Sequence, residues 1–173
     1  MSVQIRKAGV ADAAVIALLG RITFAETFEH LFCAHQGDLR AYLDQTFDVA
    51  KIERSLGKPE NAYWLAFSAA LPVGYAKLKQ PSPPPGMRAQ DEAQLQKIYI
   101  LRQFLGRRIG CTLLKHAMHE AAARASLLWL DVLQDNERAA GFYRKHGFAV
   151  VGADIYAIGA QRFTFHIMTR AAA

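Results

Sequence analysis

The chain has only two cysteines, Cys33 and Cys111, which lie far apart and form no C-x-x-C motif. A disulfide framework or a clustered zinc site needs more cysteines at closer spacing, so we expect two reduced thiols. The chain also lacks a run of about 18 apolar residues, the length that a membrane-spanning helix requires. The first nine residues carry charges and no apolar stretch, unlike a secretory signal. These absences predict a cytoplasmic protein with no membrane partner.

Acidic residues are the scarcer charge, since 15 Asp and Glu against 21 Lys and Arg give a formal net charge of +6. A basic balance suits nucleic acids, anionic membranes or anionic ligands, and it also occurs on ordinary soluble surfaces. No known nucleic-acid-binding motif accompanies the charge, so we expect no nucleic-acid partner. The 173 residues are 52% hydrophobic and suffice for one compact domain over residues 1–173, whereas two domains would both be marginal.

The apolar patterns follow an order that predicts one mixed sheet with helices. Strands are expected at residues 3–5, 63–67, 73–78, 93–101, 127–133, 148–151 and 163–168. Helices are expected at residues 13–19, 38–47, 109–124 and 136–145, with a helix or tight loop at 24–32 and a further turn near 52–56. Asp12 and Asn136 would cap the helices after them, and Gly147 would end the last helix in a left-handed conformation. The fold class is therefore α/β (α+β), a mixed, mostly antiparallel sheet of about six to seven strands with helices on both faces.

The strongest local feature is a strand, a basic glycine loop and an amphipathic helix, which together span Ile98 to Leu114. A helix N-terminus exposes unpaired N–H groups and the positive end of the helix dipole, so it attracts anions. Gly106 and Gly110 would let the backbone approach phosphate oxygens closely. Three arginines add positive charge at the same point: Arg102, Arg107 and Arg108. The segment predicts a diphosphate site, although the loop alone is equally compatible with an ordinary strand–helix turn.

Two segments resemble the GNAT superfamily of acetyltransferases. Residues 99–114 are similar to the superfamily's acetyl-CoA loop, whose pattern is Gln or Arg, two residues, Gly, one residue, then Gly or Ala. Residues 136–148 are similar to its Asn…Ala…Phe-Tyr…Gly-Phe segment. Shorter stretches of the N-terminal half, such as 73–78, and of the C-terminal end resemble the PaiA-type spermidine/spermine N-acetyltransferases. The resemblance implies a single GNAT-like domain that moves an acetyl group from acetyl-CoA to a primary amine, with no metal.

The resemblance also assigns roles residue by residue. It implies that the backbone of Ile98, Tyr99 and Ile100 pairs with the pantetheine arm of the coenzyme. It implies that backbone N–H groups of the loop and first helical turn cradle the pyrophosphate; these residues are Gly106, Arg107, Arg108, Ile109, Gly110 and Cys111. Asn136 would contact the pantetheine or acetyl region, and Tyr143 would face the thioester sulfur.

The sequence departs from the coenzyme-loop pattern at two positions. In the register that also fits the helix from Ile109 onward, Leu105 occupies the Gln/Arg position and Arg108 occupies the first glycine position. The Arg108 side chain would either crowd the phosphates or bind them through its guanidinium group. A second register uses Gln103 and Gly106, but it ends on Arg108 in place of Gly or Ala. It also moves the helix start, so we prefer the first.

The chemistry needs a proton donor for the departing thiolate and a group that takes the proton of the amine. Tyr143 would act as the acid, because a tyrosine hydroxyl with an ordinary pKa near 10 can donate its proton within hydrogen-bond reach. Glu26 and Glu29 lie in the segment expected to wall the acceptor pocket, where either could accept a proton or hold a cationic substrate. Asp131, on the buried strand, is a candidate partnered core carboxylate. No general base is assigned.

Three functional hypotheses remain open at this stage. Transfer to an amine is the first, by direct attack in a ternary complex, with a polyamine such as spermidine or spermine favoured over an amino acid, an aminoglycoside-like amine or a protein N-terminus. The net charge of +6 opposes a polycation mildly. A non-catalytic acetyl-CoA-binding module is the second, and nucleic-acid binding through the basic loop is the third. A homodimer is left open. His116 and His119 do not form H-E-x-x-H, so no metal site is expected.

Overall fold

Seven strands form one sheet in the order β1-β2-β3-β4-β5-β7-β6 in the computed structural model, which describes residues 3–86 and 91–173. The strands are β1 (Val3–Lys7), β2 (Asn61–Ser68), β3 (Leu71–Lys79), β4 (Glu92–Ile100), β5 (Leu127–Leu133), β6 (Ala149–Ile158) and β7 (Gln161–Ala171). Only β4 and β5 pair in parallel, and every other neighbouring pair is antiparallel. The mixed, mostly antiparallel sheet expected from the sequence is confirmed.

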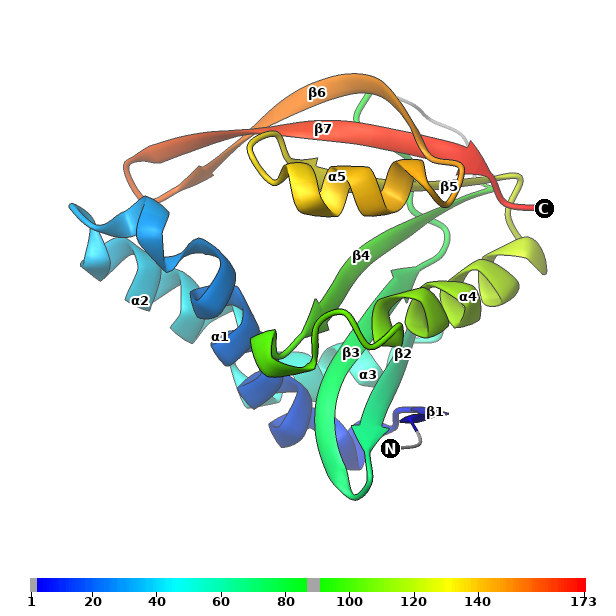
Figure 1. The fold of residues 1–173 in the computed structure, drawn as a ribbon, viewed down its shortest axis with the longest axis horizontal. Coiled ribbons are helices and arrows are strands. Elements are labelled where there is room, and N and C mark those ends of the chain that lie inside the picture. Colours follow the sequence, from blue (N-terminus) through cyan, green and yellow to red (C-terminus); the bar gives the residue numbers. More distant parts are fainter. Residues whose placement is uncertain (1–2, 87–90) are drawn as a thin grey trace.

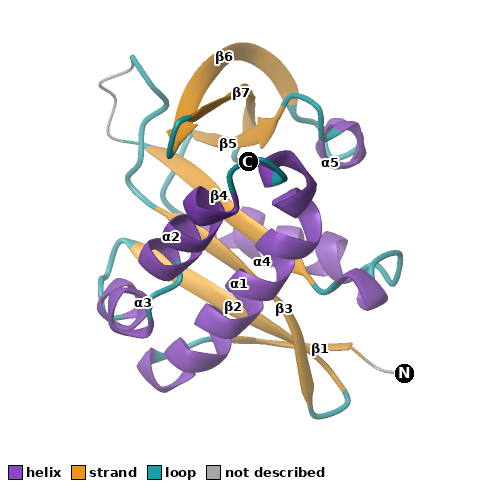
Figure 2. Ribbon diagram, turned by 90° about the vertical axis from the view of Figure 1, so that its left-hand side faces the viewer, coloured by secondary structure: helices purple, strands orange, loops and turns teal. Residues whose placement is uncertain are grey.

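Helices cover both faces of the central strands, as Figures 1 and 2 show. One face carries α1 (Ala13–Phe28), α2 (Gln36–Thr46) and α3 (Val49–Leu56), which bury their apolar side chains with those of the sheet in two clusters. The opposite face carries α4 (Ile109–Ala122) and α5 (Glu137–Arg144), which share the largest cluster. Strands β2 to β4 therefore have helices on both sides, and the nearly continuous apolar run of β2 follows from that position.

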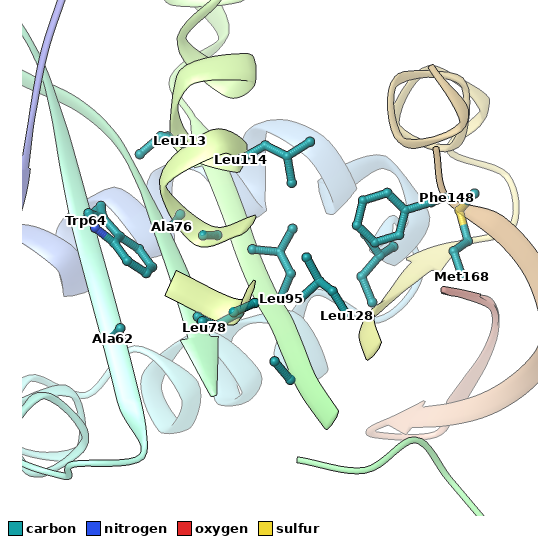
Figure 3. Close-up of a cluster of buried hydrophobic side chains, with 14 of the residues drawn as sticks. Ala62, Trp64, Ala76, Leu78, Leu95, Leu113, Leu114, Leu128, Phe148 and Met168 are labelled. Carbon is teal, nitrogen blue, oxygen red and sulfur yellow. The ribbon is translucent and has the colours of Figure 1, made fainter. Parts of the chain in front are cut away.

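The largest core cluster lies between α4 and the sheet (Figure 3). Leu114 lies on the side of α4 near Leu95 of β4, Leu113 lies on the side near Trp64 of β2, and both leucines of α4 are fully buried. Phe148 and Met168 extend the same cluster to the C-terminal strands. This packing fixes the start of α4 against the end of β4, where the expected anion site lies.

The helices at the N-terminal end differ from the sequence predictions at three points. Helix α1 runs through Phe28 and continues into a 3-10 turn at Glu29–Phe32, so the ambiguous segment is helical. Helix α2 begins at Gln36 rather than at Asp38. Asp12 precedes α1 but does not cap it, because its carboxylate accepts hydrogen bonds from the Arg6 guanidinium at 2.7 and 2.8 Å and from the Gly9 backbone N–H at 2.9 Å.

The last two strands form a hairpin longer than the sequence patterns predict. Strand β6 is exposed along most of its length, and apolar residues such as Val151 and Ile155 lie on the exposed side, so its pattern does not mark a buried face. The α5 predictions hold: Asn136 caps the helix by accepting from the Ala139 N–H at 3.1 Å, and Gly147 follows it with φ +85°.

The tip of the β6–β7 hairpin is tied to α2. Asp38 accepts a hydrogen bond from the backbone N–H of Ala160 at 3.0 Å, and the rings of Phe32 and Phe163 lie 5.3 Å apart. Gly159 adopts φ +58°, and a Cβ there would lie 2.1 Å from Cγ of Asp38. The contact therefore requires a glycine, and it brings the hairpin beside the helical layer, as Figure 1 shows at the left.

Strands β4 and β5 pair only at their first residues. Their parallel register covers Glu92 to Gln94 opposite Leu127 to Trp129, and β5 then continues along β7 for its whole length. In Figure 1 the two strands lie together on the right and separate toward the left. A wedge opens between them in the middle of the sheet. Within the described residues, no helix is long and apolar enough to cross a bilayer.

Replacing Gly159 by alanine should weaken the tie between the hairpin and α2. The left-handed backbone penalty and the displacement of Asp38 should together lower the free energy of unfolding by about 1–3 kcal/mol, measured by urea denaturation. Gly152 is the matched control on β6, because a Cβ there meets nothing within 4 Å. Gly152→Ala should leave stability unchanged or raise it slightly, and equal losses in the two variants would contradict the tie.

Candidate active site

The wedge between β4 and β5 contains two adjoining cavities. One, of about 550 Å³, lies on the α4 and α5 side, and the other, of about 500 Å³, lies on the α1 and α2 side. Both are lined by Ile98 and Ile100 of β4 and by Asn136 and Tyr143 beside or on α5. The two cavities therefore meet at the edge of β4 that β5 leaves.

The edge of β4 offers backbone groups to the α4-side cavity. The N–H of Leu101 donates to the carbonyl of Val73 at 2.9 Å, so Leu101, and by strand alternation Tyr99, direct their backbone groups toward β3. Ile98 and Ile100 then direct theirs toward β5, which pairs with β4 no further than Gln94 in the described chain. Of the three residues expected to pair with the coenzyme, these two provide the available N–H and C=O groups.

The first turn of α4 presents backbone N–H groups to the α4-side cavity. In the described structure no side chain caps this helix, so the N–H groups of Ile109, Gly110 and Cys111 have no intrahelical acceptor. These three residues line the α4-side cavity together with Gly106, whose φ is +81°. Gly110 is packed closely, since a Cβ there would lie 3.4 Å from Ile100 Cδ1.

Arg108 occupies the position before this helix in a left-handed conformation, with φ 60° and ψ 9°. That conformation favours glycine, and the GNAT-like pattern has glycine at this position in the register that begins the helix at Ile109. The helix does begin at Ile109, which agrees with that register. Arg108 therefore keeps the backbone path of the pattern although its side chain departs from it, and it lines the cavity.

Arginines surround the α4-side cavity from three elements. Arg102, Arg108 and Arg138 line it, whereas Arg107 does not and instead lies over the Phe104 ring at 4.9 Å. The sequence patterns did not single out Arg138, whose position at the start of α5 is set by the Asn136 cap. A cavity with three guanidinium groups and an open helix N-terminus suits a ligand that carries phosphates.

Neither glutamate expected in the acceptor pocket lies there. The carboxylate of Glu26 accepts a hydrogen bond from the backbone N–H of Arg102 at 2.9 Å, and its carbonyl accepts one from the Arg102 guanidinium. Glu26 therefore lines the α4-side cavity and joins α1 to the end of β4. Glu29 is exposed and lines neither cavity.

Aromatic side chains dominate the α1-side cavity. They are Phe24, Phe28, Phe32, Tyr42, Tyr99, Tyr143, Tyr156, Phe163 and Phe165. Among its lining residues only Asp131 and Lys97 carry a formal charge. The cavity thus combines apolar walls with one carboxylate and one ammonium group, which is the composition of a pocket for a small organic ligand.

Tyr143 stands where the two cavities meet. Its ring packs against Phe142, with centroids 5.1 Å apart, and against Phe148 at 5.7 Å, so α5 and β6 fix its direction. Burial, and then the nearby charge of Asp131, raise the pKa of the Tyr143 hydroxyl well above its usual range. The hydroxyl therefore holds its proton at neutral pH, as a general acid requires.

Asp131 is the carboxylate of the α1-side cavity. Its Oδ2 accepts a hydrogen bond from the Tyr156 hydroxyl at 3.1 Å. Burial raises the pKa of Asp131, while the Tyr156 hydrogen bond and the charge of Lys97 oppose that shift. Sequence reasoning noted Asp131 only as a core carboxylate. Its partner Tyr156 lies on β6 beyond the strand expected at residues 148–151, so no sequence pattern indicated the pair.

Lys97 faces the same cavity from β4. Its ammonium group lies 5.1 Å from the centroid of the Phe47 ring and 5.0 Å from that of Tyr99. Burial lowers the pKa of Lys97 to about 8, with Asp131 acting in the opposite direction. The sequence shows a lysine inside the central strand expected at residues 93–101. That Lys97 faces a cavity depends on how the surrounding helices pack, which the sequence pattern does not encode.

The arrangement combines an open helix N-terminus with arginines, a free strand edge and a protonated tyrosine on one side with an aromatic pocket on the other. A linear ligand with a diphosphate could lie along β4 and present its far end to Tyr143. A second molecule in the aromatic pocket would reach the same point from the opposite side. The site therefore suits group transfer between two substrates bound at once.

Comparison with known proteins agrees with this geometry. The sequence model described as the acetyltransferase (GNAT) family matches residues 24–148. An uncharacterized N-acetyltransferase of Mycobacterium tuberculosis is 29% identical over 134 residues, which cover 76% of this chain and 81% of that protein. The N-alpha-acetyltransferase RimI of the same species is 32% identical over 109 residues, covering 63% and 65%. The crystal structure of the PaiA N-acetyltransferase from Thermoplasma acidophilum in complex with coenzyme A has the same fold, with a TM-score of 0.79, 23% identity and 99% of both chains covered.

Replacing Arg108 by glycine should relieve the left-handed backbone at the start of α4. Arg108→Ala removes the same guanidinium group but keeps a Cβ, so it serves as the matched control. The glycine variant should exceed the alanine variant in free energy of unfolding by about 1 kcal/mol, measured by urea denaturation. Equal stabilities would mean that the turn relaxes and that the left-handed conformation carries no penalty.

Proposed function

This chain belongs to the GNAT family of acetyltransferases and is an acetyl-CoA-dependent N-acetyltransferase, and we propose that a primary amine attacks the acetyl group directly while both substrates are bound. The observation that carries the proposal is the junction of the two cavities at Tyr143. The amine would enter from the aromatic pocket and the acetyl donor from the α4 side. No covalent enzyme intermediate is needed, because the donor and the acceptor meet directly.

The described residues fit the coenzyme that the family uses. The N–H groups of Ile109, Gly110 and Cys111 would hold the pyrophosphate, and Ile98 and Ile100 would pair with the pantetheine arm as an added strand. The close packing of Gly110 on Ile100 keeps the first turn of α4 beside the strand edge. Asn136 uses its side-chain oxygen to cap α5, which leaves its amide nitrogen as a donor toward the same arm. Arg102, Arg108 and Arg138 would supply the positive charge for the phosphates.

Residues of this chain can assist both the attack on the carbonyl group and the departure of the thiolate. Acetyl-CoA supplies an activated carbonyl and a thiolate leaving group. The N–H groups at the β4 edge would stabilise negative charge on the carbonyl oxygen, as backbone donors do in acyl transfer. Tyr143 would donate its hydroxyl proton to the departing sulfur, since this hydroxyl is protonated at neutral pH.

The amine must lose its ammonium proton before it can attack the carbonyl. Asp131 is the carboxylate that lines the aromatic cavity, so it is the candidate for accepting this proton. It lines the aromatic cavity with Tyr143, and its charge acts on the Tyr143 hydroxyl. Burial raises the pKa of Asp131, which increases its affinity for the proton that the amine releases. We therefore propose that Asp131 holds the ammonium group and accepts its proton, directly or through water.

The polyamine acceptor implied by the PaiA resemblance has less support than a smaller amine. Glu26 and Glu29, which could have held a cationic substrate, do not line the aromatic cavity. A polycation would meet one carboxylate, Asp131, and one lysine, Lys97. The relative RimI is named for N-alpha acetylation, so amino acids and protein N-termini belong in the acceptor panel beside spermidine and spermine.

Replacing Tyr143 by phenylalanine tests the transfer reaction. Release of free thiol from acetyl-CoA should occur with at least one amine of a panel of polyamines, amino acids, aminoglycosides and peptides. Tyr143→Phe should lower turnover by about 10²–10⁴-fold, because only the hydroxyl is lost, while calorimetry should give a modest change in acetyl-CoA affinity. A non-catalytic coenzyme-binding module predicts binding with no thiol release for any amine, and an unaltered rate would remove Tyr143 from the mechanism.

Replacing Asp131 by asparagine should lower turnover without lowering stability. Because burial raises the pKa of Asp131, the folded chain binds its proton more tightly than the unfolded chain does, and the ionised form opposes folding at neutral pH. The melting temperature of Asp131→Asn should therefore equal or exceed that of the parent at neutral pH. The difference should shrink as the pH falls toward about 4, where the parent becomes protonated.

Asp44 provides the control for this substitution, because its carboxylate is largely exposed in an ion pair with Arg21. Asp44→Asn should change neither turnover nor melting temperature appreciably, since an exposed pair contributes little. A melting temperature for Asp131→Asn well below that of the parent would assign Asp131 a structural role instead.

A further inference from the structure

Two lysines stand side by side next to the aromatic cavity. Lys77 of β3 and Lys97 of β4 are direct partners in the strand register, so their side chains leave the same face of the sheet. Like charges opposite one another destabilise a sheet, and the charge of Lys97 contributes to the lowered pKa of Lys77. The repulsion between Lys77 and Lys97 therefore destabilises the sheet, and packing within the sheet gives no reason for two lysines at these positions.

No carboxylate forms an ion pair with either lysine in the described residues. Their ammonium groups lie over aromatic rings instead, with Lys77 5.4 Å from the Tyr63 centroid and Lys97 near Phe47 and Tyr99. The charge of Lys51, from α3, adds to the positive field at both lysines. Positive charge without an ion-pair partner thus borders one wall of the cavity.

The other charge of the cavity has the opposite sign. Asp131 attracts Lys97 across the cavity, since the charge of each shifts the pKa of the other toward the ionised form. They form no ion pair in the described structure, and Asp131 is bonded to Tyr156 instead. A ligand that bridged the two walls would therefore carry a cation at the Asp131 end and an anion at the Lys97 end.

We propose that the acetyl acceptor carries a carboxylate or a similar compact anion in addition to its amine, and that Lys97 binds this anion while Asp131 receives the amine. This inference rests on the proposed function and specifies its substrate class. The apolar body of such an acceptor would lie among the aromatic walls. Lys97 would act as a specificity residue, since it contacts the acceptor at a distance from the reacting atoms. A polycationic acceptor would be repelled at the same point.

Pairs of acceptors that differ only in the anion test the inference. Phenylalanine against 2-phenylethylamine, leucine against 3-methylbutylamine, and O-phosphoethanolamine against ethanolamine form three such pairs, and spermidine is added as the polycation. The measurement is kcat/KM for each acceptor by thiol release at saturating acetyl-CoA. The parent protein should prefer the anionic member of at least one pair by about 10–100-fold. Preference in a carboxylate pair or in the phosphate pair identifies which anion is bound.

Lys97→Met removes the ammonium group and keeps a long apolar side chain, so packing on Phe47 and Tyr99 is retained. It should abolish most of the preference by raising KM for the anionic acceptor, while KM for acetyl-CoA and the rate with the anion-free amine change little. Lys145→Gln removes an equal charge from an exposed position outside both cavities and should leave the preference intact. A merely structural role for Lys97 predicts an unchanged ratio between the paired acceptors.

The outcomes separate this inference from the proposed function. Turnover of amines or spermidine with no preference for an anion in any pair overturns the inference and leaves the transferase function standing. Binding of acetyl-CoA with no thiol release from any acceptor overturns both. The comparison within the parent protein needs no variant, so a Lys97→Met protein that failed to fold would not remove the test.

Discussion

The site follows from one constraint on backbone pairing, the separation of β4 from β5 after three residue pairs. A strand in the middle of a sheet cannot leave its N–H and C=O groups buried without partners. Strand β5 pairs with β7 along its whole length. Beyond Gln94, β4 pairs with β3 on one side and with no described strand on the other. The open side of β4 is therefore available to a ligand that can bond like a strand. The wedge also leaves room for side chains from both helical layers, which is why two cavities meet there.

Sequence patterns predicted the parts of this arrangement that depend on local structure. The strands β2 to β5 and helix α4 follow from apolar periodicity, and the open N-terminus of α4 follows from a strand, glycines and a helix in succession. The Asn136 cap and the left-handed Gly147 are also local. At Arg108 the sequence departs from the glycine of the coenzyme-loop pattern, but the backbone there is still left-handed. The pattern therefore predicted the start of α4 correctly although one of its residues differs.

The rest depends on contacts between distant segments, which no local pattern encodes. Glu26 is held by Arg102, 76 residues away in the chain, and so it cannot be distinguished in the sequence from an acceptor-pocket residue. Asp12 resembles a helix cap, but the nearby Arg6 guanidinium binds its carboxylate. The aromatic cavity combines residues of α1, β4, β5 and the β6–β7 hairpin, and its charged groups became apparent only when these elements were seen together. Those groups are also unfavourable for folding, since burial shifts the pKa of both Asp131 and Lys97 toward the neutral form.

The hydrogen bond between Asp38 and the hairpin tip holds the hairpin beside the aromatic cavity, which the hairpin lines through Ile158 and Phe163. Gly159 and Ala160 belong to a turn between two strands, a place where chains tolerate insertions and deletions well. A longer or shorter turn would resize the aromatic cavity while β4, α4 and α5 kept their places. If that cavity takes the acceptor, as proposed, changes at the hairpin tip would alter the choice of acceptor without moving the elements that line the α4-side cavity.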